Sequence, residues 1–122
     1  MEILNLQNRK VAGDNLAHLL DCLKENSSIR KLNISKNAFP ALSENFSEAL
    51  KEFVEQNKRV EELRVQSCGI EEKKKKIILN SLKKNKTLTI LNLEFSEFSE
   101  ECAHTLVEAM RKQKFNGTQI VH

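Results

Sequence analysis

Apolar residues return at fixed intervals along this chain and mark four short segments of the same design. The segments cover residues 1–11, 29–39, 60–70 and 88–98, so their starts lie 28, 31 and 28 residues apart. Positions one, four, six and eleven of every segment are apolar, as Leu4 and Leu6 in the first and Leu91 and Leu93 in the last illustrate. Alternation at positions four and six is typical of a strand with one buried face, so each segment predicts a short strand.

Helical patterns fill the intervals between these segments. Apolar residues recur there with spacings of three and four, which places them along one face of a helix. The four stripes consist of Leu16, Leu19, Leu20 and Leu23; of Phe46, Ala49, Leu50, Phe53 and Val54; of Ile78, Leu79 and Leu82; and of Ala103, Leu106, Val107 and Met110. The chain therefore alternates strands with helices.

Polar residues stand where these helices are expected to begin and end. Asp14 and Ser99 precede or open apolar stripes and are the types that cap a helix N-terminus. Asn26, Asn57 and Asn85 each lie three residues before a strand segment. Because Asn tolerates the left-handed conformation that ends many helices, these three are predicted to be C-caps.

A strand–helix unit of about 30 residues cannot bury its own apolar face. Stacking such units pairs their strands into a parallel sheet and buries both stripes between the two layers. We therefore expect an α/β solenoid with helices on its convex side, formed by one domain over residues 1–122. Its units would cover about 1–28, 29–59, 60–87 and 88–114, and Thr118, Ile120 and Val121 favour a partial fifth strand in the tail 115–122.

The segments resemble leucine-rich repeats, whose strand pattern is L-x-x-L-x-L-x-x-N/C-x-L. The unit length and the full helix in each unit look like the ribonuclease-inhibitor subclass, which also occurs in NOD-like receptors, tropomodulins, the Ran GTPase-activating protein and bacterial effectors. Asn37 and Cys68 match the ninth position of the pattern, whereas Arg9 and Ser96 depart from it. The resemblance implies the horseshoe fold, and it implies a ladder of side chains between turns that is incomplete at the first and last units.

Composition excludes several classes of protein. The formal charge of +3 is too small to indicate nucleic acid by itself, and the chain has no Trp or Tyr for stacking bases. No apolar run is long enough to span a membrane, and residues 1–5 do not open a secretory signal. Cys22, Cys68 and Cys102 form an odd, sparse set, which favours free thiols in a reducing compartment. We therefore expect a cytoplasmic protein.

Motifs for catalysis or for cofactor binding are missing from the sequence. It contains no G-x-S-x-G, P-loop or H-E-x-x-H pattern, and its three glycines are isolated. His18 and Cys22 have a spacing that metal ligands can use, but no third ligand accompanies them. Cys22 is instead expected to pack beside the first leucine stripe as a small apolar residue. The sequence thus predicts no enzyme, cofactor, metal or small-molecule substrate.

The concave face of the expected sheet is the candidate binding surface. Its side chains are mixed and polar, which suits hydrogen bonding to a folded protein, and Arg64 and Phe95 are of types enriched at binding hot spots. The candidate partner-binding residues are Asn5, Gln7, Lys31, Asn33, Ser35, Glu62, Arg64, Gln66, Asn92, Glu94 and Phe95. The sequence therefore favours a non-catalytic interaction module whose partner is a protein of unknown identity.

Three other interpretations stay open. Similarity to tropomodulins implies a regulator of actin filaments at their pointed ends. The run of lysines at 73–76 could bind anionic lipids or nucleic acid, although charged residues usually cover the solvated face of a helix. The first strand has no predicted neighbour on its outer side, so it could mediate self-association, or the chain could belong to a longer array.

Overall fold

Strands and helices alternate throughout the computed structural model, which describes residues 2–37, 44–65, 72–92, 100–112 and 119–121. The elements are β1 (Ile3–Asn5), α1 (Gly13–Leu23), β2 (Lys31–Asn33), α2 (Glu44–Gln56), β3 (Glu62–Arg64), α3 (Glu72–Ser81) with the 3-10 turn η1 (Leu82–Lys84), β4 (Ile90–Asn92), α4 (Glu100–Lys112) and β5 (Gln119–Val121). The last strand lies within the tail for which β-branched residues favoured a strand.

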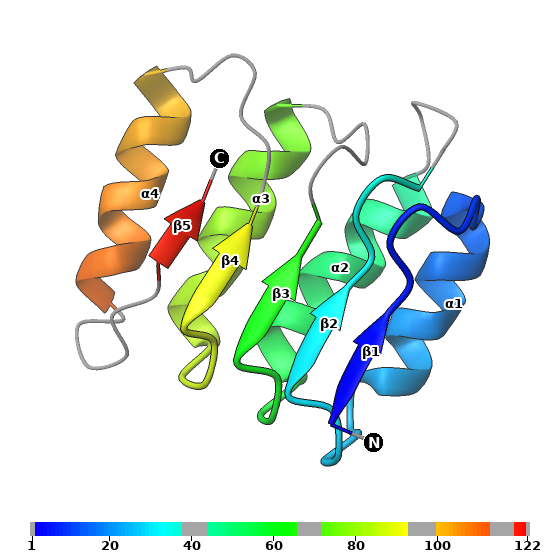
Figure 1. Cartoon of the computed structure of the whole chain (residues 1–122). Coiled ribbons are helices and arrows are strands. Elements are labelled where there is room, and N and C mark those ends of the chain that lie inside the picture. Colours follow the sequence, from blue (N-terminus) through cyan, green and yellow to red (C-terminus); the bar gives the residue numbers. More distant parts are fainter. Residues whose placement is uncertain (1, 38–43, 66–71, 93–99, 113–118, 122) are drawn as a thin grey trace.

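All five strands are parallel and follow one another in chain order across the sheet. The helices cover one face of this sheet and leave the other open (Figure 1). Each strand therefore lies directly beside the strand of the preceding unit. The predicted α/β architecture of stacked parallel units is confirmed.

The core lies between the sheet and the helices. Leu32, Leu63 and Leu91 occupy the same register position on β2, β3 and β4, and each is at most 1% exposed. Leu20 and Phe53 reach the same layer from α1 and α2 and are buried as well. Burial of a side chain of this size stabilises the fold by about 1.5–3 kcal/mol, so the shared interior holds the units together.

Three details of the helices differ from the prediction. Helix α1 begins at Gly13 with Ala12 as its N-cap, so Asp14 lies in the first turn instead of capping it. Cys22 is exposed and does not pack beside the leucine stripe. Val107 is 51% exposed, because no further helix covers α4 within the described part of the chain. Ser99, the other predicted N-cap, lies outside the described residues.

Two of the three asparagines before the strands, Asn57 and Asn85, bridge adjacent units, and none of the three has a left-handed backbone conformation. Asn57 Nδ2 donates to the carbonyl oxygen of Leu23 at the end of α1, 2.9 Å away, and Asn85 Nδ2 donates to that of Val54 at 2.8 Å. The Oδ1 atoms accept backbone N–H groups of their own turns, as from Val60 at 2.8 Å for Asn57. Positive φ angles among the described non-glycine residues occur instead at Asn8, Lys10 and Lys36. The predicted left-handed conformation was wrong, because each side chain forms hydrogen bonds to its own turn. Asn85 does occupy the C-cap position of η1, with an extended backbone.

Asn37 forms a second bridge at the other end of the strands. Its Nδ2 donates to the carbonyl oxygens of Leu6 and Ile34, at 3.1 and 2.8 Å, and its Oδ1 accepts from the backbone N–H groups of Arg9 and Val11. The side chain is 2% exposed and belongs to the ninth repeat position. Asn37 thus ties the C-terminal ends of β1 and β2, which helps to fix the strands that carry the candidate site.

Candidate functional site

The open face of the sheet, opposite the helices, carries two rows of side chains. The strand register aligns Ile3, Lys31, Glu62 and Ile90 in the first row and Asn5, Asn33, Arg64 and Asn92 in the second. Successive residues of a strand point to opposite faces, so these side chains lie opposite the leucine row of the core. The open face corresponds to the concave surface predicted from the sequence.

The predicted site residues divide into three groups by their exposure. Asn5 and Lys31 are exposed, and the half-buried residues are Gln7, Asn33, Glu62 and Arg64. Ser35 and Asn92 are buried, at 4% and 6% exposure, so they offer almost no surface to a partner. Gln66, Glu94 and Phe95 lie outside the described residues. The exposed and half-buried members come together on β1, β2 and β3.

Charged side chains occupy the middle of this face. The guanidinium of Arg64 donates from Nη2 to Glu62 Oε1 at 2.9 Å, between two residues of the same strand. Lys31 stands beside Glu62 in the register, on the neighbouring strand β2. Opposite charges on neighbouring strands favour each other by a few tenths of a kcal/mol to about 1 kcal/mol. The centre of the open face therefore holds the Arg64–Glu62 ion pair with Lys31 at the neighbouring register position.

Amide side chains occupy the part of the open face next to these charged residues. Asn33 Nδ2 donates to Gln7 Oε1 at 2.9 Å, which links the side chains of the first two units. Asn5 Oδ1 accepts the backbone N–H of Gln7 at 3.0 Å, and Asn33 Oδ1 accepts that of Ser35 at the same distance. Because these side chains are already ordered, a partner that binds them loses less of their conformational entropy.

Apolar side chains lie on either side of Lys31 and Glu62 in the first row, and the predicted site residues did not include them. Ile3 is 58% exposed and Ile90 is half-buried. They share the register position of Lys31 and Glu62, a signal that the repeat alignment already contained. Two isoleucines flanking a charged centre add apolar contact area to the polar face.

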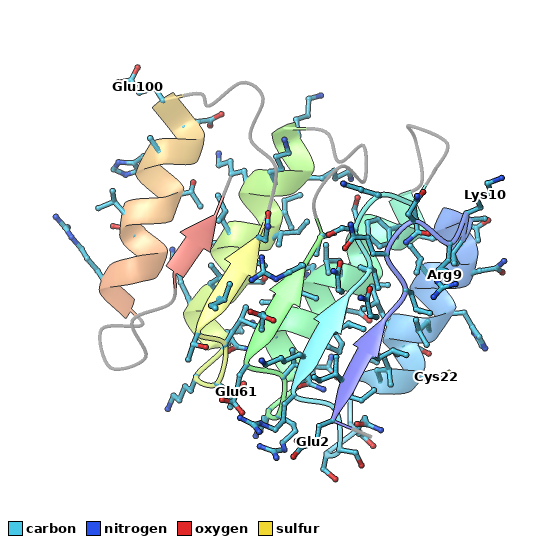
Figure 2. All side chains as sticks on the ribbon, viewed as in Figure 1. Glu2, Arg9, Lys10, Cys22, Glu61 and Glu100 are labelled. Atoms are coloured by element: carbon cyan, nitrogen blue, oxygen red, sulfur yellow. The ribbon has the colours of Figure 1, made fainter. Side chains whose placement is uncertain are left out.

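A second set of charges that the prediction missed lies where the strands begin. Arg30 Nε donates to Glu61 Oε2 at 2.7 Å, and Glu2 and Arg59 stand 3.7 Å from members of this pair. The hydrogen bond from Arg30 holds the pKa of the Glu61 carboxyl below its usual value and raises the pKa of Arg30. Glu2 and Glu61 are labelled at this edge of the sheet in Figure 2. These charges lie just before β1, β2 and β3, so they border the open face.

The lysine run lies on α3, in the helical layer. Lys75 is buried at 8% exposure, and Lys76 Nζ lies 2.6 Å from Glu101 Oε1 on α4. Further along, Lys83 pairs with Glu108 at 3.6 Å and Lys84 with Glu55 at 3.8 Å. Half of the 73–76 run is thus buried or ion-paired, which reduces the basic surface that an anionic lipid or a nucleic acid would need.

The described residues show no group of three or more His, Cys, Asp or Glu side chains that could hold a metal ion. Cys22 Sγ lies 3.9 Å from His18 Nε2 on the exposed surface of α1. Cys68 and the side chain of Cys102 lie outside what is described. Among the helices of the described part, none has the length and apolar character to cross a membrane.

Comparison with known proteins gives matches among solved structures only. No family model matches the sequence, and no curated protein matches it. A structure titled "Leiomodin-1 Actin-Binding Site 2 (ABS2)" superposes with a TM-score of 0.72 at 24% identity, over 93% of this chain and 66% of that one. The tropomodulin C-terminal domain of Caenorhabditis elegans gives a TM-score of 0.53 at 14% identity, over 93% of this chain and 84% of that one.

These matches establish the fold. The chain has the leucine-rich-repeat architecture of the ribonuclease-inhibitor type, as its repeat pattern predicted. It spans slightly less than two thirds of the leiomodin chain it matches. At this level of identity the likeness extends to the backbone and does not carry over a partner.

Proposed function

We propose that this leucine-rich-repeat chain is a non-catalytic protein-binding module whose open face receives the partner. One observation carries the proposal. The register places Lys31, Glu62 and Arg64 together at the centre of that face, with an exposed isoleucine beyond them on β1. Arginine is enriched at binding hot spots, and charged groups at fixed positions select a partner of complementary charge pattern.

The physical state of these groups supports a protein partner. The Arg64–Glu62 and Asn33–Gln7 pairs are formed before binding, so a partner can add hydrogen bonds to side chains that already have one orientation. The strands hold them at successive positions about 4.8 Å apart, the ordinary spacing of a sheet. A broad polar surface of this kind matches the polar, extended contacts that folded proteins make.

Site-specific photo-cross-linking tests the proposal. A photoreactive amino acid at position 31 lies on the open face, whereas the same group at position 73 lies on an exposed residue of α3 on the helical side. In extracts of the source cell, position 31 is expected to give discrete protein adducts that position 73 does not give. Equal adducts from both positions, or adducts from position 73 alone, would place the binding surface elsewhere.

Actin is the first specific partner to test. The observation in its favour is the TM-score of 0.72 to a structure whose title names an actin-binding site. Titration of labelled actin monomers with the chain is expected to give a saturable signal that weakens when Lys31 and Arg64 are both replaced by alanine. A pointed-end elongation assay then shows whether binding affects filament growth. A flat titration at concentrations up to about 100 μM, where binding is weaker than about −5.5 kcal/mol, would exclude actin and leave the general proposal standing.

A further inference from the structure

The core is less well covered at the first unit than at the second and third. Leu4 and Leu6 of β1 are half-buried, whereas Leu32 and Ile34 at the same positions of the next unit are at most 1% exposed. The partly buried apolar residues that pack against the core come mostly from the first unit and comprise Leu4, Val11, Leu19 and Leu23, together with Ala49 of α2. An apolar strip thus runs along the outer side of β1 and α1, the edge unit in Figure 1.

The backbone of β1 also has N–H and C=O groups that point to this outer side. The carbonyl oxygen of Glu2 accepts from the backbone N–H of Lys31, and the N–H of Leu6 donates to Asn33, so residues of even number face β2. Alternation along a strand directs the N–H and C=O groups of Ile3 and Asn5 the opposite way. No other described strand lies on that side of β1. An edge of this kind is a template for another strand.

Charge is distributed unevenly between the two ends of this edge. Arg9 and Lys10 follow the C-terminal end of β1, while Glu2 precedes its N-terminal end, and Figure 2 shows them at opposite ends of the unit. Because α1 runs antiparallel to β1, the exposed Glu25 after α1 lies at the same end as Glu2. One end of the edge is therefore basic and the other is acidic.

Other charges near this edge are already paired with groups of this chain. Asp14 accepts a hydrogen bond from Asn45 of α2, and Asp21 pairs with Lys24 at 2.7 Å. Arg30 is drawn toward Glu61 of the next unit. His18 is exposed and lies near Cys22 on α1. Glu2 lies 3.7 Å from Arg30, but its side chain is 65% exposed, so it joins Arg9, Lys10 and Glu25 as a charge that can face a neighbour at this edge.

We infer that the first unit binds the first unit of a second copy of this chain, with β1 antiparallel to β1 about a two-fold axis. This orientation brings the basic end of each copy against the acidic end of the other, and a two-fold axis repeats the favourable contact twice. It continues the sheet across the interface through the N–H and C=O groups of Ile3 and Asn5, and it covers the strip containing Leu4, Leu19 and Leu23. The dipoles of the two α1 helices also run in opposite directions, which is favourable.

Variants with reversed charges distinguish the antiparallel pairing of two β1 strands from a parallel pairing. An acidic variant carries Arg9→Glu and Lys10→Asp, since Asp tolerates the positive φ of residue 10. A basic variant carries Glu2→Lys and Glu25→Lys. Each alone places like charges across the two-fold axis and is expected to raise the dimer dissociation constant about tenfold or more. Mixed in equal amounts, the two variants restore opposite charges at both ends and are expected to form a heterodimer.

Sedimentation velocity of the parent, of each variant and of their mixture measures these outcomes. The parent is expected to shift from monomer to dimer with rising concentration, and only the mixture of variants to regain that shift. A Lys73→Glu variant with Lys86→Glu, in α3 and in the turn before β4, serves as a control with the same charge change as the acidic variant and is expected to dimerise as the parent does. Circular dichroism checks that each variant is folded.

Four results would overturn the inference: a parent that stays monomeric at all concentrations, variants that dimerise as well as the parent, a mixture that dimerises no better than its components, or species that grow beyond a dimer. The last result would indicate stacking of the first unit on the last unit of another copy. Because none of these outcomes concerns the open face, the inference and the proposed function can fail separately.

Discussion

Asn57 donates a hydrogen bond from Nδ2 to the carbonyl oxygen of Leu23, 2.9 Å away and 34 residues earlier in the chain. The same side chain accepts the backbone N–H groups of Arg59 and Val60 through Oδ1. It therefore provides hydrogen-bond partners both for a carbonyl group at the end of α1 and for two N–H groups just before β3. Because it is 3% exposed, water cannot replace these bonds if the side chain is removed.

Asn57→Ala is expected to lower the free energy of unfolding by about 2–3 kcal/mol, since it leaves several buried backbone groups without partners. Asn26→Ala is the matched control. Asn26 is half-buried, and the bonds described for its side chain lie within its own turn, so about 1 kcal/mol is expected there. Urea denaturation of the two variants measures the difference. Equal losses would show that the bridge between units adds nothing.

Leu63→Ala tests the shared interior. Leu63 is 0% exposed at the centre of the leucine row, so the substitution removes buried contacts and leaves a cavity, with an expected loss of about 2–5 kcal/mol. Val107→Ala changes an exposed apolar residue of α4 and is expected to stay within about 0.5 kcal/mol of the parent. Thermal and urea denaturation provide both values. Similar effects at the two positions would contradict the placement of the core.

The Arg30–Glu61 pair gives the stability a dependence on pH. The folded-state pKa of Glu61 lies below its usual value because Arg30 donates a hydrogen bond to it, so the pair stabilises the fold above the pKa of the unfolded state. That contribution is lost as the pH falls through the folded-state pKa. Urea midpoints between pH 7 and pH 3 are therefore expected to fall more steeply for the parent than for Glu61→Gln. Asp21 titrates in both proteins, so its effect is common to the two curves of urea midpoint against pH. Parallel curves would show that the Arg30–Glu61 pair contributes nothing to the pH dependence of stability.

The exposed thiol of Cys22 corrects a prediction and can be tested directly. A thiol at the surface reacts with Ellman's reagent in the folded protein, whereas a buried thiol reacts only on unfolding. The native parent is expected to show one more fast-reacting equivalent than Cys22→Ser. An equal number of fast-reacting equivalents in the two proteins would show that Cys22 is buried.

The sequence was sufficient for the fold because the leucine row repeats the same physical requirement in every unit. Leu4, Leu32, Leu63 and Leu91 occupy one register position, as their spacing in the chain required. The roles of the asparagines could not be predicted from local propensity, since Asn favours both left-handed caps and side-chain bonds to the backbone. Their repetition at 26, 57 and 85 was a signal for a ladder between units.

The candidate face was predicted only in part. Strand alternation correctly placed Lys31, Glu62 and Arg64 on one face, because that property follows from a period of two. It could not show that Ser35 and Asn92 are buried, since burial there depends on neighbouring turns and strands and not on the strand itself. The pairing of Arg30 with Glu61 was missed because it joins loops 31 residues apart.

The central claim is that the open face binds the partner. It is tested most directly by the affinity of this chain for the protein that is cross-linked to position 31. Isothermal titration would compare the parent with a triple variant of the open face, Lys31→Glu, Asn33→Ala and Arg64→Ala. The control, called the helical-side variant, carries Lys73→Glu and Asn80→Ala in α3 and Lys84→Ala in η1. The account predicts that the open-face variant binds at least about tenfold more weakly while the helical-side variant binds as the parent does. Unchanged binding by the open-face variant, with loss in the other, would contradict it.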